Sequence, residues 1–486
     1  MTEPLHELIH SLSAGEKGYF KKHAPAGESN YLALFDLINR MDEPDEEKLA
    51  KEFRKKKLGK NLAMARQYLY EGILRSLRSY HKARYFEAQT EEMIFNAKLL
   101  FEKGRYDDCA RQLKKTKEQA WKYEHLPQLL SLLEFEDRFN QFRLADNRET
   151  LEEEKRVLEI LGTNNRLSIA YNALLQFLFR HDKAKTEAER AEAAALLNDP
   201  ALQRDPQTLS FRGKNLFYGI HFFYRYVCGD DVRATQEKTK QLENYLQHPH
   251  MIEANARLFL LVLGNVLSML YYLEDREAFN KYYAQMLESH AALSGHEHIR
   301  LEQSLSFGVL YYKINCLTSE GIRFIEAHEE TINANAPRFG LIKLLDIYFN
   351  ACIFYFRAGD YKRAIHWLNK VLNNEKVEER QHIHCYSRIL QLVIHYELGN
   401  AELLESLAKS THRYLYRRNK IYAFDHLFLQ YIKHIARDYY DEEKKKLHFT
   451  NLRGELLRLQ GDAMQKHSIA HFDYVGWLEK KAGQKL

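Results

Sequence analysis

Apolar side chains recur at three- and four-residue steps along most of the chain, which is the spacing of one face of an α-helix. The clearest case lies between residues 344 and 374, where bulky residues such as Tyr348 and Tyr355 alternate with small ones. Its second half places side chains at steps of three, four and three: Tyr361, Ala364, Leu368 and Val371. The pattern predicts two amphipathic helices that pack against each other.

A tight turn at Gly359 and Asp360 separates the two predicted helices. Glycine is favoured just after a helix because it adopts the left-handed conformation without a Cβ penalty. Aspartate is favoured just before a helix because its carboxylate accepts the free N–H groups of the first turn. We therefore expect one helix to end before Gly359 and the next to be capped by Asp360.

Turn residues and prolines recur along the chain with a common period. Turns are predicted near Gly104, Ala145, Asp182, Gly229, Glu274, Asn315, Gly359 and Gly399. Pro127, Pro206, Pro249 and Pro337 each precede a long periodic segment and lie 79, 43 and 88 residues apart. These distances approximate two, one and two multiples of a unit of about 40 to 44 residues, which indicates a helical repeat. The prediction is an all-α fold.

An aromatic residue stands three positions before each predicted turn. The set is Phe101, Phe142, Phe179, Tyr226, Tyr271, Tyr312, Phe356 and Tyr396. Rings at this place either pack between successive helices, as large residues do in any helical core, or line a groove and contact a partner. The sequence leaves both interpretations open.

The unit around Gly359 resembles a tetratricopeptide repeat. The resemblance lies in Gly359-x-Tyr361-x-x-Ala364, preceded by Tyr348, Ala351, Cys352 and Tyr355, with Cys352 where that family prefers glycine. The stretch from Tyr396 to Leu415 is also similar to a group of uncharacterised bacterial proteins of this type. The resemblance implies a right-handed α-solenoid of about eight helix pairs with helical caps at both ends. We expect a basic N-terminal cap at 1–84, the repeat array at 85–420 and a C-terminal cap at 421–486.

The resemblance also implies where a partner binds, because the family uses the first helix of each repeat to line its concave face. The corresponding residues here are Asn265, Ser268, Tyr271, Tyr272, Asp346, Phe349, Asn350 and Arg357. Asn265 and Asn350 occupy matching positions, and asparagine side chains can hold an extended peptide by paired hydrogen bonds. The charged clamp that some members use for a C-terminal carboxylate is not reproduced. We expect a non-enzymatic scaffold that binds a protein or peptide segment.

A basic stretch near the N-terminus supports a second hypothesis. Residues 46–74 fit two helices joined by a turn at Gly59, a layout similar to a helix-turn-helix. The side chains that would contact nucleic acid are Lys55, Lys56, Lys57, Lys60 and Arg66. The chain would then be a transcriptional or signalling regulator whose repeat array acts as the sensor. The alternative is a solvated charged face on the first cap.

Composition restricts the remaining classes of function. The formal net charge of +5 over 486 residues is small, so bulk electrostatics require neither a nucleic acid nor a membrane as partner. The five cysteines are scattered without a C-x-x-C pair, as in a reducing compartment. The start of the chain has no secretory signal, and the longest uncharged run is shorter than the roughly 20 residues of a membrane span. We expect a cytoplasmic protein.

No sequence motif for catalysis or for a cofactor is present. Phosphate-binding glycine loops, nucleophile elbows and metalloprotease motifs are all missing from the sequence. The histidine pairs His248/His250, His296/His298 and His382/His384 have members two residues apart, which on a helix point to different sides. We therefore expect no catalytic residue, no metal site and no cofactor.

Overall fold

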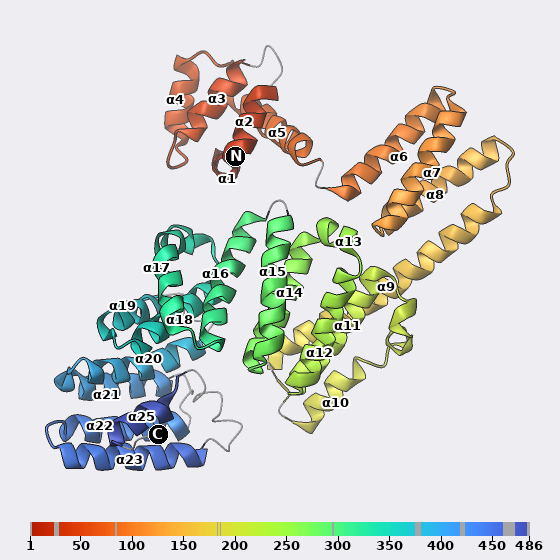
Figure 1. Cartoon of the computed structure of the whole chain (residues 1–486). Coiled ribbons are helices and arrows are strands. Elements are labelled where there is room, and N and C mark those ends of the chain that lie inside the picture. Colours follow the sequence, from red (N-terminus) through yellow and green to blue (C-terminus); the bar gives the residue numbers. More distant parts are fainter. Residues whose placement is uncertain are drawn as a thin grey trace. The chain divides into compact units, whose positions relative to one another are not determined.

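The structure is a computed structural model of the whole chain (Figure 1). It describes residues 2–23, 29–82, 85–181, 183–184, 186–293, 296–374, 381–417, 423–459 and 472–483. These residues form α-helices and short 3₁₀ turns, and none of them lies in a strand, so the predicted all-α class is confirmed. The chain divides into two compact units: Met1–Cys228 with Glu243–Asn255, and Gly229–Leu242 with Ala256–Leu486.

Unit 1 begins with a bundle that has its own hydrophobic core. Its helices are α1 (Thr2–Ser11), α2 (Ala14–His23), α3 (Ser29–Asn39), α4 (Glu46–Lys55) and α5 (Leu62–His81). Phe35 and Ile73 are fully buried in this core. Helix α1 packs on α3 and α5, and α2 packs on α5, so the contacts do not follow chain order. This bundle therefore differs from the helix pairs that follow it.

The rest of unit 1 is built mainly from helices that pack on their neighbours in the chain. They are α6 (Phe86–Glu102), α7 (Tyr106–Lys122), α8 (Leu126–Phe142), α9 (Arg148–His181), α10 (Glu187–Ala195), η2 (Pro200–Gln203), η3 (Pro206–Thr208), α11 (Phe211–Val227) and α13 (Pro249–Ala254). Helix α12 (Asp231–Leu246) has residues in both units. Contacts join α6 to α7, α7 to α8 and α8 to α9, and α9 also packs against α11.

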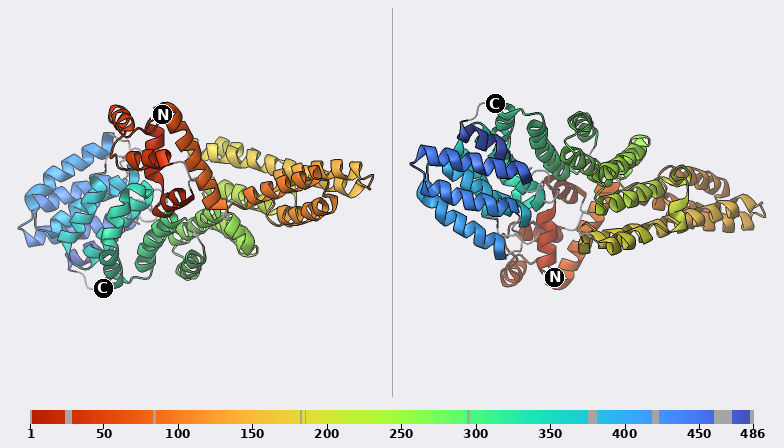
Figure 2. Two further views of the ribbon diagram at one scale, coloured as in Figure 1. Left: turned by 90° about the horizontal axis from the view of Figure 1, so that it is seen from above. Right: turned by 90° about the horizontal axis from the view of Figure 1, so that it is seen from below.

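Unit 2 contains five consecutive helix pairs in the part of the chain that the structure describes. They are α14 (Ala256–Tyr272) with α15 (Arg276–Ala292), α16 (Glu297–Ile314) with α17 (Thr318–Asn335), α18 (Leu341–Arg357) with α19 (Tyr361–Leu372), α20 (Gln381–Glu397) with α21 (Ala401–Arg417), and α22 (Ala423–Arg437) with α23 (Glu442–Leu459). The turn η4 (Ala336–Arg338) precedes α18, and α25 (Tyr474–Ala482) follows α23. Figure 2 gives two further views of these helices.

Each first helix from α14 to α20 packs on its own partner and on the first helix of the next pair. Contacts join α14 to α16, α16 to α18, α18 to α20 and α20 to α22. One hydrophobic cluster runs from α16 through to α25, with Trp367, Phe428 and Leu452 among its buried members. Such nearest-neighbour packing is typical of a helical repeat, which is the architecture that the regular spacing of turn residues and prolines predicts.

The turn at Gly359 has the predicted geometry. Its φ of +79° is left-handed, Gly359 N donates to Phe356 O at 3.0 Å, and Asp360 N donates to Tyr355 O at 2.9 Å. This pair of hydrogen bonds closes a helix end with a Schellman motif. Asp360 Oδ1 then accepts from Arg363 N at 3.0 Å and caps α19. Both expectations for this turn are confirmed.

The same left-handed turn ends each first helix from α14 to α20. The residues with positive φ are Glu274, Cys316, Gly359 and Gly399, which lie 42, 43 and 40 residues apart. The predicted period of about 40 to 44 residues therefore holds in unit 2. The turn predicted at Asn315 is centred one residue later, at Cys316. The residue type gave no signal there, because cysteine has no preference for positive φ.

Unit 1 departs from the predicted repeat. A series of helix pairs would need a break between the turns near Ala145 and Asp182, but α9 runs for 34 residues without one. No proline or left-handed residue interrupts Arg148–His181, so two expected helices continue as one. The turn before α9 is centred on Leu144 instead of Ala145. Asp182 and the domain boundaries at residues 84 and 420–421 lie outside the described residues.

Candidate functional site

Residues from three successive first helices are joined side by side in unit 2. The Lys313 ammonium of α16 donates to Asn350 Oδ1 of α18 at 2.7 Å and lies 5.7 Å from the ring centre of Tyr271 on α14. Tyr271 and Asn350 both belong to the set of partner-binding residues predicted from sequence. Lys313, which links them, was not predicted. The row formed by α14, α16 and α18 is therefore continuous at the level of side chains.

Helix α14 presents a stripe of exposed side chains to solvent, and one of them, Tyr272, belongs to the predicted set. Leu258, Leu261 and Tyr272 are 54%, 57% and 53% exposed, and they follow one another at helical spacing. Asn265 and Ser268 lie between them and are half-buried. The Ser268 hydroxyl donates to Gly264 O at 2.9 Å. The Asn265 amide has no hydrogen-bond partner within the described ranges, so it remains free to bind another molecule.

The predicted residues of α18 are less accessible. Asn350 is buried and also donates to Asp346 O at 2.7 Å, and Phe349 is buried with its ring centre 5.9 Å from that of Tyr386. Asp346 is half-buried, whereas Arg357 at the end of the helix is exposed. Helix α18 packs against first helices on both sides, which explains why these positions are covered. Of the α18 set, Arg357 is the residue best placed to meet a partner.

Most rings of the aromatic series pack between helices. Phe101 lies 5.9 Å from Phe135, Tyr271 lies 6.2 Å from Phe279, and Tyr312 lies 5.3 Å from Phe324, all as ring-centre distances. Phe142 and Phe179 are the exposed members of the series. The core interpretation therefore accounts for the majority of these residues.

Phe356 and Tyr396, the last two rings of the series, meet the C-terminal end of the chain. The Phe356 ring centre lies 4.9 Å from that of Phe472, and the Tyr396 ring centre lies 5.9 Å from that of Trp477. Both contacts are edge-to-face, a favoured geometry for aromatic pairs. The segment Phe472–Lys481 thus returns to the ends of α18 and α20, although Phe472 follows Phe356 by 116 residues and Trp477 follows Tyr396 by 81.

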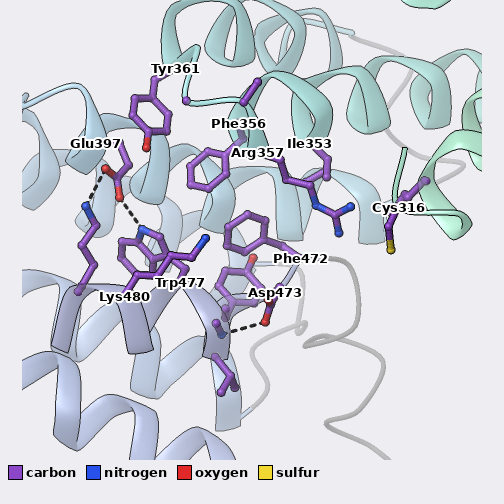
Figure 3. A pocket seen from close by; sticks show the side chains of 17 residues that line it. Cys316, Ile353, Phe356, Arg357, Tyr361, Glu397, Phe472, Asp473, Trp477 and Lys480 are labelled. Carbon is purple, nitrogen blue, oxygen red and sulfur yellow. Dashed lines mark hydrogen bonds and ion pairs between the residues drawn. The ribbon is translucent and has the colours of Figure 1, made fainter. Parts of the chain in front are cut away.

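A pocket of about 970 Å³ opens where this C-terminal segment meets the ends of α16, α18 and α20 (Figure 3). Phe356, Tyr361 and Trp477 contribute aromatic surface. Lys313, Arg357, Lys480 and Lys481 contribute positive charge, and Glu397 and Asp473 contribute negative charge. The pocket therefore combines apolar walls with an excess of cations.

Both carboxylates of the pocket are already engaged. Glu397 accepts hydrogen bonds from Trp477 Nε1 at 2.6 Å and from Lys481 Nζ at 2.8 Å. Asp473 Oδ1 accepts from Gly476 N at 2.9 Å and so caps α25. Burial, together with the neighbouring Glu397, raises the pKa of the Tyr361 hydroxyl. The contacts of Glu397 therefore fix α25 against the repeat, and the hydrogen bond to Asp473 caps the start of that helix.

Two cations of the pocket remain unpaired. No hydrogen bond or ion pair joins Arg357 or Lys480 to another residue among those the structure describes. Both side chains are labelled in Figure 3. Both side chains are exposed. A guanidinium and an ammonium free of internal partners favour an anionic group on whatever enters the pocket.

The basic residues of the second hypothesis divide into two groups. Lys55, Lys56, Lys57 and Lys60 are exposed around the connection between α4 and α5. Arg66 is buried, and its Nη2 donates to Glu46 Oε1 at 2.8 Å. The guanidinium is therefore held inside the bundle, while the four lysines point to solvent.

The histidine pairs do not assemble with other ligands. The rings of His248 and His250 lie 6.1 Å apart, and His296 is the left-handed residue that precedes α16. The side chain of His382 lies outside the described residues. Across the described ranges, no group of three or more His, Cys, Asp or Glu side chains is close enough to hold a metal ion.

Comparison with known proteins adds no assignment. The chain matches no protein-family model, and no match is found among curated proteins or solved structures. The resemblance to tetratricopeptide repeats therefore rests on the residues around Gly359. None of the described helices combines the length and the apolar composition that a membrane crossing requires.

Proposed function

We propose that this protein is a non-enzymatic scaffold that binds a segment of a protein partner along the first helices of unit 2. The observation that carries the proposal is the pocket beside Arg357, which has aromatic walls and two unpaired cations at the end of the row of first helices. The carboxylates of the pocket are engaged in structural contacts, so binding is favoured over acid–base chemistry.

The returning C-terminal segment supports the same function. Phe472 and Trp477 pack on rings of the first helices, and Glu397 receives two hydrogen bonds from α25. The surface thus already accommodates a peptide segment through aromatic anchors and charged hydrogen bonds, the groups that dominate protein interfaces. A partner segment carrying an aromatic residue and an acidic residue has the matching chemistry.

The proposal also covers the handedness of the repeat and the face on which its first helices lie. We propose that the repeat is a right-handed solenoid of the tetratricopeptide type, with the first helices α14, α16, α18 and α20 on its concave face. The row joined by Tyr271, Lys313 and Asn350 supports this arrangement. We further propose that the protein acts in the cytoplasm, because its five cysteines are scattered without a C-x-x-C pair.

Selection from a random peptide-display library tests the function directly. We expect enriched peptides to combine an aromatic residue with Asp or Glu and to bind with a Kd on the order of micromolar. The double substitution of Arg357 and Lys480 by alanine should weaken binding at least tenfold, since it removes two charge-assisted contacts. The matched control is Arg458→Ala, an exposed residue of unit 2 outside the pocket.

Two outcomes of this selection would refute the proposal. One is the absence of any enriched peptide that binds the purified protein. The other is a set of peptides that bind the double variant and the Arg458→Ala variant equally well. The circular dichroism of both variants should match that of the wild type, because all three side chains are exposed.

A second candidate function is regulation through nucleic-acid binding by the N-terminal bundle. The observation that favours it is the group of exposed lysines at the α4–α5 connection, Lys55, Lys56, Lys57 and Lys60. If these residues contact phosphates, a mobility-shift assay with duplex DNA should show binding that falls steeply with salt. Replacing the four lysines by glutamine should abolish the shift. Binding that is unchanged by this replacement would eliminate the candidate.

A further inference from the structure

A second cavity lies within unit 1 and is formed by segments far apart in the chain. Its volume is about 510 Å³, inside the range of about 300 to 1,000 Å³ that is typical of small-molecule sites. The walls come from the end of α7, from α9, from the segment 207–214 and from α13. Residues between 121 and 251 therefore meet in one concave surface.

Among the described residues that line this cavity, Glu124 carries the one carboxylate, and the protein backbone hydrogen-bonds to it. Glu124 accepts hydrogen bonds from the backbone N–H groups of Phe211 at 2.5 Å and of Arg212 at 3.0 Å. A carboxylate in this position caps the start of α11 and offsets the positive end of the helix dipole. Both oxygens of the Glu124 carboxylate therefore bind the protein backbone at the start of α11.

The cations in the same wall have no acidic partner. No ion pair involves Lys122 or Arg156 in the portion of the chain that is described, and Lys214 Nζ donates only to the neutral amide of Gln207, at 3.3 Å. His248 and His250 add two imidazoles to the wall. Unpaired cations gathered in one concavity concentrate positive potential, because the low-dielectric walls focus the field.

Flat surfaces lie beside these cations. The Arg156 guanidinium lies 5.1 Å from the ring centre of Trp121, and the Trp121 indole is fixed by a hydrogen bond from its Nε1 to Glu153. Elsewhere in the lining of the cavity, the His248 ring centre lies 5.5 Å from that of Phe211. Ile160, Leu209 and Met251 complete the apolar part of the lining among the described residues.

We propose that this cavity binds a small phosphate ester with a flat aromatic body, a ligand of the nucleotide class. Lys122, Arg156 and Lys214 bind the phosphates, and the ring of the ligand packs on the Trp121 and Arg156 wall. The assignment rests on unpaired cations beside an aromatic and apolar lining, since a purely inorganic anion would leave the aromatic side chains without a contact. The site is independent of the pocket beside Arg357.

Calorimetric titration of the full chain at low salt tests this proposal with three probes: ATP, adenosine and inorganic triphosphate. We expect saturable binding of ATP with a Kd on the order of micromolar, and at least tenfold weaker binding of the other two. Arg156→Gln should weaken ATP binding at least tenfold. Lys155→Gln is the matched control, because Lys155 is the exposed neighbour on α9 and does not line the cavity.

Tryptophan fluorescence, excited at a wavelength that ATP does not absorb, locates the bound ligand. The chain has three tryptophans, of which Trp121 lines this cavity, Trp477 lines the other pocket, and Trp367 is buried. We expect ATP to change the emission of the wild type and of Trp477→Phe but not of Trp121→Phe. The proposal is overturned if ATP gives no saturable heat, if Arg156→Gln binds as well as Lys155→Gln, or if triphosphate binds as tightly as ATP.

Discussion

Replacing Glu397 by alanine should release helix α25 from the repeat. The Glu397 side chain is only 7% exposed, and its carboxylate accepts from Trp477 Nε1 at 2.6 Å and from Lys481 Nζ at 2.8 Å. A Tyr361 hydroxyl in contact with the same carboxylate completes the group. The substitution leaves an indole N–H and an ammonium without their acceptor, both contributed by α25.

The size of the effect follows from these contacts. Hydrogen bonds to a charged group contribute about 1.5–3 kcal/mol each, and breaking a buried pair from one side costs about 3–5 kcal/mol. Lys481 is partly exposed and regains water when α25 is released, which reduces the loss. We therefore expect the opening free energy of α25 to fall by about 2–4 kcal/mol. That change corresponds to a roughly 30- to 700-fold faster exchange of its amide hydrogens.

Hydrogen exchange followed by mass spectrometry measures this change for the peptide that covers Tyr474–Ala482. The matched control is Glu405→Ala, because Glu405 forms an exposed pair with Lys409, and such pairs contribute about 0–1 kcal/mol. Exchange in α25 should be unaffected by the control. If Glu397→Ala and Glu405→Ala gave the same exchange rates in α25, the carboxylate would not hold the helix and the reasoning would fail.

Three further predictions concern stability, each measured by urea denaturation. Gly359→Val should lower the free energy of unfolding by about 1–3 kcal/mol, because φ is +79° and backbone strain is the only penalty. Gly359→Asn should lower it less, since asparagine tolerates the left-handed conformation. Equal losses of stability in the two variants would argue against a left-handed turn. Gly321→Ala should destabilise the protein by about 1–2 kcal/mol, because the added Cβ would lie 2.7 Å from the buried Phe354 ring. Gly162→Ala should stabilise it by about 0.5–1 kcal/mol, because no neighbour lies within 4 Å of the added Cβ. A change of the same sign in both variants would contradict this packing. Burial lowers the pKa of Lys238 to about 8 from 10.5, so between these pH values the unfolded chain binds more protons and the free energy of unfolding should rise with pH. Lys238→Met should remove this rise, which is worth about 3 kcal/mol. A variant with the same pH profile as the wild type would contradict the prediction.

The turns show which parts of the fold could be predicted from sequence. Gly359 and Asp360 have residue-specific conformational preferences, so the turn and the cap were predictable and are confirmed. Glu124 and Cys316 adopt the same left-handed geometry without any such preference. Their conformation is imposed by the packing of the helices on either side, which no local pattern reveals. The period therefore was predictable, and the exact turn residue was not.

The candidate site shows a similar division. Arg357 was identified from its place at the end of a first helix, and it lines the pocket. Asn350 was predicted from the same helix but is buried, because apolar residues occupy every face of α18 and periodicity cannot distinguish them. Trp477 and Lys480 were not identified, since their contribution depends on how the chain returns to α18 and α20.

Helix α9 couples cores that would otherwise be separate. Its 34 residues span about 51 Å at 1.5 Å per residue. Val157 belongs to one hydrophobic cluster, Leu167 and Leu174 to a second, and Phe177 to a third. Because one uninterrupted rod contributes to all three clusters, none of them can open without straining the hydrogen-bond ladder that also supports the others. This part of unit 1 should therefore melt as a single cooperative block, with no hinge along the rod.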